Sequence, residues 1–160
     1  EASAPFFSHT PSEAIPDFEL GGVRLRVLIG QAYGQRSPVR TPSPLFYVEV
    51  RMRAGRALPL PEDYPERAVY VISGTVASGE ERTGPGSLWA FRPGVPVTLR
   101  AETEAHVMLL GGAPLDEARH LWWNFVSSDK ATIEQAKADW QAGRFPKVPG
   151  DETAFVPLPE

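Results

Sequence analysis

The chain has 160 residues, 42% of them hydrophobic and 22% charged, with no cysteine and a formal net charge of −4 at pH 7. The absence of cysteine excludes disulfides, thiolate metal sites and thiol nucleophiles, and the negative charge disfavours a nucleic-acid-binding surface. The 17 prolines and 14 glycines favour a turn-rich β fold over a helical bundle. No stretch approaches the ~18 apolar residues of a membrane-spanning helix, and we expect a cytoplasmic protein.

The N-terminal third is predicted to contain an arm and two strands. Residues 1–16 are polar and rich in proline, so we expect a linker or leading arm, and residues 17–160 are expected to form the domain. Gly22–Gly30 and Leu45–Arg53 follow, in which apolar and polar residues alternate with a period of two. This alternation predicts two half-buried strands. In the first strand, the residues expected on the buried face are Val23, Leu25, Val27 and Ile29.

The middle of the chain, Gly55–Glu102, consists of short apolar runs separated by glycine and proline turns. A small antiparallel barrel or jelly roll requires such a pattern, because each strand must turn before it outgrows the barrel. The predicted strands are Ala68–Ser73, Thr75–Ser78, Ser87–Phe91 and Val97–Ala101, followed by the nearly continuous apolar strand His106–Gly111.

The glycine spacing in this stretch resembles the two motifs of the cupin superfamily, with Gly55, Gly74, Gly86 and Gly94 at the motif positions. The metal ligands of those motifs are replaced. Leu60 and Glu62, or Pro61 and Asp63 in the alternative register, stand where two histidines belong, Arg67 replaces the glutamate, and Val97 replaces the last histidine. A guanidinium cannot be deprotonated to coordinate a cation. We therefore expect a barrel without the metal chemistry.

The last third changes in character. Arg119–Val126 is an aromatic cluster, Ser127–Asp129 can cap a helix, and Lys130–Ala142 has helical composition. One helix face carries Ile133, Ala136, Lys137 and Trp140. A helix of this length is not stable alone in water, so we expect this face to lie on the barrel or on another protein. Phe145–Glu160 is predicted to be an extended tail anchored by Phe145, Phe155 and Val156.

Five segments together resemble the C-terminal half of pirin-family proteins: Ala32–Pro38, Glu66–Gly74, Leu109–Leu115, His120–Ser128 and Ile133–Asp151. The resemblance implies an all-β, cupin-type double-stranded β-helix (a jelly-roll barrel) with one C-terminal α-helix and an extended tail. Pirins pair two cupins. The resemblance implies iron only in an N-terminal cupin, with quercetin 2,3-dioxygenase activity in some members and a regulatory role in others.

Three functional hypotheses follow. In the first, the chain is a metal-free, non-catalytic cupin that serves as scaffold or partner to a metal-bearing N-terminal cupin or to another cupin subunit. The candidate interface is aromatic-rich and consists of His120, Trp122, Trp123, Phe125 and Trp140. The alternative for these aromatics is that they cover one end of the barrel.

In the second hypothesis, the chain is part of a dioxygenase of the quercetinase type whose metal site lies in a missing N-terminal half. A metal site in this chain itself would need unusual ligands, such as Glu62, Asp63 and His106. In the third hypothesis, the barrel binds a small anionic aromatic molecule without a metal. The candidate pocket residues, chosen for charge pairing and stacking, are Arg67, Tyr70, Trp89 and His106.

Overall fold

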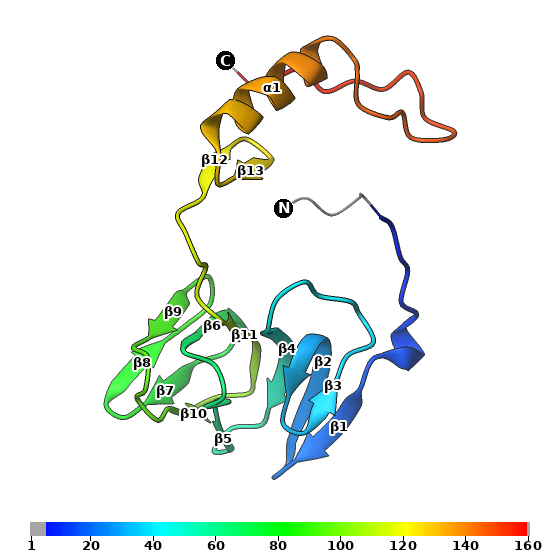
Figure 1. Cartoon of the computed structure of the whole chain (residues 1–160). Coiled ribbons are helices and arrows are strands. Elements are labelled where there is room, and N and C mark those ends of the chain that lie inside the picture. Colours follow the sequence, from blue (N-terminus) through cyan, green and yellow to red (C-terminus); the bar gives the residue numbers. More distant parts are fainter. Residues whose placement is uncertain (1–5, 160) are drawn as a thin grey trace. The chain divides into compact units, whose positions relative to one another are not determined.

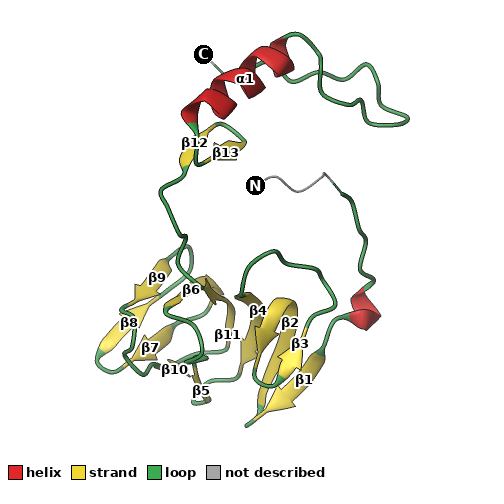
Figure 2. Ribbon diagram, viewed as in Figure 1, coloured by secondary structure: helices red, strands yellow, loops and turns green. Residues whose placement is uncertain are grey.

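The computed structural model describes residues 6–159, which form two compact units (Figure 1). The barrel unit is Phe6–Pro114, and the C-terminal unit comprises residues 115–159 of the described chain. Strands dominate the barrel unit, and the one α-helix of the described residues belongs to the C-terminal unit (Figure 2). The prediction of an all-β chain with one C-terminal helix is confirmed.

The larger sheet of the barrel unit is antiparallel throughout. Its strand order is β1 (Asp17–Leu20), β2 (Val23–Ala32), β4 (Leu45–Met52), β11 (Ala105–Gly112), β6 (Glu66–Ser73) and β9 (Leu88–Phe91), with β3 (Gln35–Arg36) paired to β2. The smaller sheet has the order β5 (Ala57–Pro59), β10 (Thr98–Ala101), β7 (Val76–Ser78) and β8 (Glu81–Thr83).

The core lies against the inner face of the larger sheet, where the period-two alternation places the apolar residues. Phe46, Val48, Val50 and Met52 of β4 are all buried, and other strands of both sheets contribute further residues to the same cluster. Burial of this continuous apolar surface is the main stabilising contribution to the barrel unit.

The alternation predicted for the first strand holds as far as Val27 and is wrong at Ile29. The register shifts between these two residues, so that Ile29 lies opposite Tyr47 on the outer face. The bulge ends at Gly30, which has φ of 77°. A Cβ at Gly30 would lie 1.8 Å from the Leu45 carbonyl oxygen, so no other residue fits there.

The second half of the predicted arm is attached to the barrel. Ser12–Ala14 forms a short 3-10 turn (η1), and the Ser12 hydroxyl accepts a hydrogen bond of 2.9 Å from Arg26. The Val27 amide donates to the Pro16 carbonyl at 3.0 Å. Residues 1–5 of the arm lie outside the described residues.

The C-terminal unit consists of a hairpin, a helix and a tail. The hairpin is formed by β12 (His120–Trp122) and β13 (Phe125–Ser127), and helix α1 spans Lys130–Gln141. Asp129 caps the helix by accepting a hydrogen bond of 2.9 Å from the Ala131 amide. The helix follows its prediction closely. The described chain contains no helix long and apolar enough to cross a membrane.

Candidate functional site

Two of the positions where cupin metal ligands belong, Leu60 and Val97, are filled by buried apolar side chains near one mouth of the barrel. Leu60 and Val97 are 2% and 6% exposed and belong to the core. The Leu60 amide donates a hydrogen bond of 2.9 Å to the Val97 carbonyl, so the two positions are direct neighbours. The fold therefore keeps these two positions side by side, but neither side chain carries a donor atom for a metal.

Arg67, at the position of the family glutamate, is 4% exposed and points to the same mouth. Its guanidinium donates to three main-chain carbonyls, those of Pro61 (3.4 Å), Arg92 (3.4 Å) and Val95 (2.7 Å). Its Nε is buried and has no hydrogen-bond partner among the described residues. Arg67 therefore ties two loops together across the mouth, because Pro61 belongs to one loop and Val95 to the other.

An open cavity of about 360 Å³ lies beside the Arg67 side chain and the two loops that it joins; we call Arg67 and its three carbonyl partners the clasp. Arg67, Tyr64 and Val95 contribute to its walls, and Glu62 and Asp63 line it from exposed positions. The Tyr64 hydroxyl donates to the Gln31 carbonyl at 2.9 Å, and its ring packs 5.0 Å from that of Phe46, which holds this wall in place.

The mouth does not fit a metal ion. Within residues 6–159, no three His, Cys, Asp or Glu side chains form a group that could hold one. Glu62 and Asp63 line the mouth, whereas His106 lines a different pocket. The structure does not bring the hypothetical ligand set together. A transition metal requires several donors converging on one point, and here a buried guanidinium adds a positive charge instead.

The four candidate pocket residues also lie apart. Arg67 and Trp89 belong to the inner face, because they are in register with Gly111 or Val69 on neighbouring strands. Tyr70 and His106 lie on the outer face, and Tyr70 is 40% exposed. The spacing of Arg67 and Tyr70 explains this division, because residues three apart on one strand point to opposite faces.

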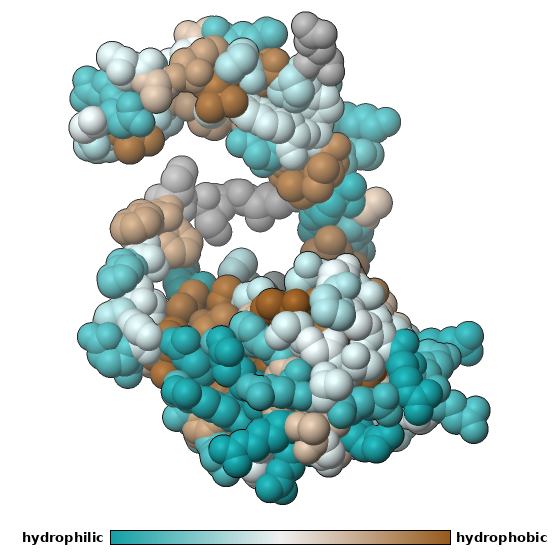
Figure 3. Space-filling view, turned by 180° about the vertical axis from the view of Figure 1, so that it is seen from behind, coloured by the Kyte–Doolittle hydropathy of each residue, from teal (hydrophilic) through white to brown (hydrophobic). Residues whose placement is uncertain are grey.

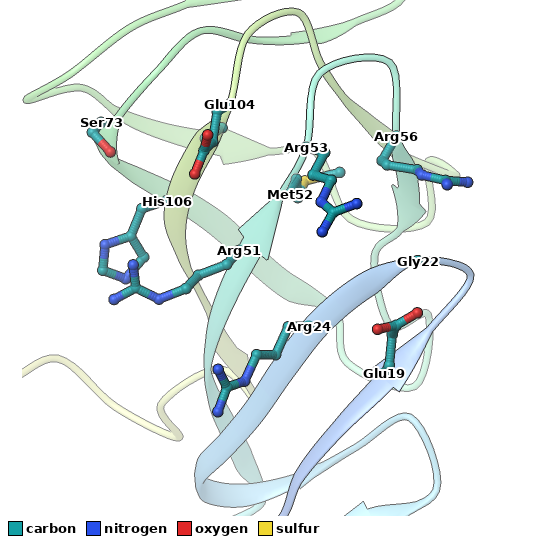
Figure 4. A pocket seen from close by; sticks show the side chains of 11 residues that line it. Glu19, Gly22, Arg24, Arg51, Met52, Arg53, Arg56, Ser73, Glu104 and His106 are labelled. Atoms are coloured by element: carbon teal, nitrogen blue, oxygen red, sulfur yellow. The ribbon is translucent and has the colours of Figure 1, made fainter.

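His106 lies on the outer face of the larger sheet beside charged neighbours. Its Nε2 is 3.0 Å from the Glu49 carboxylate, an ion pair when the imidazole is protonated. It lines an open pocket of about 370 Å³, together with Ser73 and several arginines (Figure 4). This pocket cannot be predicted from the sequence, because it is assembled from turns and strand ends that lie far apart in the chain.

The aromatic residues predicted to form an interface pack against one another in the C-terminal unit. Trp140 of α1 is central, with ring centroids 5.2 Å from Trp123, 6.3 Å from Phe125 and 6.0 Å from Phe155. The Trp140 indole also donates to the Val156 carbonyl at 2.8 Å. Trp122 is covered by Lys137, whose Nζ lies 4.3 Å from the ring centroid. His120 is half-buried at the start of the hairpin.

Much of this aromatic cluster remains accessible. Trp123 is 36% exposed and Phe145 is 39% exposed, while Leu121 and Val126, on the other face of the hairpin, are 73% and 56% exposed. Hydrophobic residues are accordingly visible on the surface of the C-terminal unit in Figure 3. The predicted tail anchors Phe145 and Phe155 join the cluster, whereas Val156 contributes its carbonyl.

Comparisons with known proteins agree on one family. The model of the Pirin C-terminal cupin domain matches residues 47–146. A pirin-like protein of Caulobacter vibrioides is 43% identical over 98% of this chain and 54% of its own length. A putative quercetin 2,3-dioxygenase of Pseudomonas aeruginosa is 29% identical over 98% of this chain and 51% of its own length.

The structural comparison gives the same result. The crystal structure of a quercetin 2,3-dioxygenase from Acinetobacter baumannii superimposes with a TM-score of 0.78 at 28% identity, covering 89% of this chain and 50% of that one. The fold is therefore of the cupin type. The chain spans about half the length of the curated relatives it matches. With its family domain at residues 47–146, this chain belongs to the pirin family.

Proposed function

We propose that the chain is the non-catalytic cupin of a two-cupin protein and acts as scaffold and partner for a metal-bearing cupin. The observation that carries this proposal is the closed barrel mouth. Leu60, Arg67 and Val97 occupy positions of cupin metal ligands, and the Arg67 guanidinium is committed to three carbonyls. A mouth built in this way offers support to a neighbouring domain rather than an open coordination site.

The aromatic cluster is the surface through which we propose that the partner cupin binds. Contacts at the centre of protein interfaces are enriched in Trp, Tyr and Phe. Trp123 and Phe145 are held by ring contacts on one side and remain accessible on the other. The partner is the cupin that makes up the other half of the longer relatives, and its arrival would remove these rings from water.

A second candidate function is participation in a dioxygenase of the quercetin 2,3-dioxygenase kind. The names of the Pseudomonas and Acinetobacter relatives favour it. In that case, the metal and the substrate would be bound by the other cupin, and this chain would stabilise that cupin by packing against it. We do not propose that the barrel binds a small aromatic anion, because the four candidate pocket residues lie on two different faces of the sheet.

Association of separately produced halves tests the scaffold proposal. The N-terminal half of the Caulobacter pirin-like protein is mixed with this chain, and complex formation is followed by sedimentation velocity. We expect a one-to-one complex whose metal remains with the N-terminal half. Trp123→Gly should weaken the complex at least about tenfold, as loss of an aromatic anchor does. Glycine suits the φ of 52° at this position, so the hairpin turn is kept.

Leu88→Ala is the control, because Leu88 is an exposed apolar residue of the barrel unit (62% exposed, against 36% for Trp123). Equal weakening by both variants would contradict the aromatic surface as the binding site. The absence of any complex, or metal bound to this chain in place of its partner, would overturn the proposed function itself.

A further inference from the structure

Two arginines and a histidine stand in register on adjacent strands of the larger sheet. Arg24 of β2 lies opposite Arg51 of β4, and Arg51 lies opposite His106 of β11. All three belong to the outer face, because their strand neighbours on either side are core residues. We call this set the cationic row. With neighbouring strands about 4.8 Å apart, its outer members are separated by roughly 10 Å.

A row of this kind is unfavourable by itself, because like charges directly opposite each other on antiparallel strands repel. The available carboxylates compensate only in part. Asp17 accepts two hydrogen bonds from Arg24, at 2.9 and 2.8 Å. Glu49 is shared by Arg51 at 3.0 Å, Arg26 at 3.4 Å and the His106 imidazole at 3.0 Å, and Arg26 also lies 3.6 Å from Asp17. Three arginines, Arg24, Arg26 and Arg51, thus face two carboxylates, which leaves capacity for a further anion.

The solvent side of the row is hollowed. Arg24 and Arg51 line two adjoining pockets of about 360 and 370 Å³, of a size that accepts a small molecule. The second pocket adds Arg53, Arg56 and the Ser73 hydroxyl, which are donors to oxyanions (Figure 4). Glu19 and Glu104 also line it, so its walls carry both signs of charge.

The position of Arg56 is set by the backbone of the β1–β2 turn. A Cβ at Gly22 would lie 2.9 Å from the Arg56 guanidinium carbon, so the guanidinium packs directly on this glycine. Gly22 has φ of 78°, a conformation that glycine adopts without strain. The arginine side chain is therefore held against the pocket wall by packing, in addition to any attraction by charge.

We propose that the cationic row binds small oxyanions of the phosphate or carboxylate class, with Arg51 at the centre of the site. Arginine presents a planar fork of N–H donors that matches both groups. The length of the row favours ligands with two anionic groups over those with one. This site lies on the outer face of the sheet and does not depend on the proposed partner cupin.

Titration of the full chain with pyrophosphate and with inorganic phosphate tests the proposal. Binding is followed by calorimetry and by amide shifts in ¹H–¹⁵N spectra, with sodium chloride at matched ionic strength as reference. We expect saturable shifts at Arg24, Arg51 and His106, with pyrophosphate binding more tightly than phosphate. Arg51→Gln should weaken pyrophosphate binding about tenfold or more, and Arg51→Lys should weaken it less, because the charge is kept while the planar fork is lost.

Arg100→Gln is the matched control. The Arg100 side chain is 55% exposed and pairs with Glu102 at 3.0 Å, whereas the Arg51 side chain is 59% exposed and pairs with Glu49 at 3.0 Å. Equal losses in the two variants, or shifts with chloride equal to those with pyrophosphate, would overturn the proposal. Thermal melting of each variant shows whether a loss of binding reflects a loss of the fold.

Discussion

In the barrel unit, the buried core cluster draws on both sheets, and all its members are at most 6% exposed. In the described part of the C-terminal unit, Ile133 (5%) is the one buried apolar residue, and the aromatic side chains around Trp140 remain half-buried or exposed. Both units use apolar side chains at the expected periodicity. They differ in whether those side chains are removed from water.

The difference indicates that the two units have different sources of stability. A continuous core supplies the barrel unit with its own hydrophobic free energy. A segment well below about 70 residues rarely obtains enough from a single core, and the C-terminal unit relies on ring contacts that each add about 0.5–1.5 kcal/mol. We therefore infer that the C-terminal unit is stabilised further when a partner covers its aromatic cluster.

The largest effect is expected in the barrel core. Phe46→Ala removes a ring that is 1% exposed and should lower the free energy of unfolding by about 3–5 kcal/mol. Chemical denaturation measures this loss. Phe7→Ala, at a position that is 93% exposed, is the control and should change little. A loss below about 1 kcal/mol for Phe46→Ala would contradict the conclusion that a buried core stabilises the barrel unit more than the C-terminal unit.

The corresponding change in the C-terminal unit is Trp140→Ala. It removes the ring that joins α1 to the hairpin and the tail. Because the site is only half-buried, we expect a loss of about 2 kcal/mol, at or below the lower end of Trp-to-Ala effects. Hydrogen exchange should accelerate in Lys130–Gln141 while the barrel strands keep their protection. Leu121→Ala is the control, and equal acceleration in the barrel would contradict independent stability.

Arg67→Met tests the clasp at the barrel mouth. The variant leaves three carbonyls without their donor, at an expected cost of about 1–3 kcal/mol. Arg67→Lys should show a similar loss, because one ammonium cannot reproduce the guanidinium fork. Amide exchange at residues 62–64, 92, 94 and 95 should rise in both variants. Unchanged exchange there would show that Arg67 does not tie the loops.

A smaller effect is expected at the start of α1. Asp129→Ala removes the acceptor of the Ala131 amide and should cost the helix about 1 kcal/mol. Glu152→Ala, an exposed acidic residue of the tail, serves as the control. We expect faster amide hydrogen exchange confined to the first turn of the helix. No change relative to the control would mean that the Asp129 cap does not stabilise the helix.

The smallest effect concerns Asp17, whose pKa is held below its ordinary value by the two hydrogen bonds from Arg24. A lowered folded-state pKa stabilises the fold above the ordinary carboxyl pKa, and this contribution is lost as the pH falls through the folded value. For an exposed pair, it stays within about 0–1 kcal/mol. NMR titration should show the lowered pKa, and Arg24→Gln should return it to the ordinary range. An ordinary pKa in the unmodified protein would contradict the pairing.

Secondary structure can be predicted from the sequence where the hydrophobic periodicity is long and regular. The alternation of Leu45–Met52 and the capped pattern of Lys130–Gln141 lead directly to β4 and α1. Short elements such as β3, β5 and β8 cannot be predicted from periodicity, because two or three residues carry no period; β7 could be predicted only because turn residues border it. The turn between β12 and β13 places Trp123 at φ of 52°, a conformation for which no glycine or asparagine at that position gives a signal.

Some features of the candidate sites could likewise be predicted from the sequence, and others could not. The replacement of metal ligands by Leu60, Arg67 and Val97 could be seen from motif spacing alone, and the opposite orientations of Arg67 and Tyr70 follow from their separation. The cationic row could not be foreseen. Arg24, Arg51 and His106 become neighbours only through the pairing register of three strands, and the β2 bulge shows how one residue can change such a register.

The most direct test of the central claim is the metal content of this chain. The protein is incubated with Fe(II), Mn(II), Ni(II) and Zn(II), desalted and analysed by plasma mass spectrometry. A barrel mouth closed by Arg67 predicts less than about a tenth of an equivalent of each metal. Near one equivalent of any of them would contradict the account and would direct attention to the Glu62 and Asp63 carboxylates at the mouth.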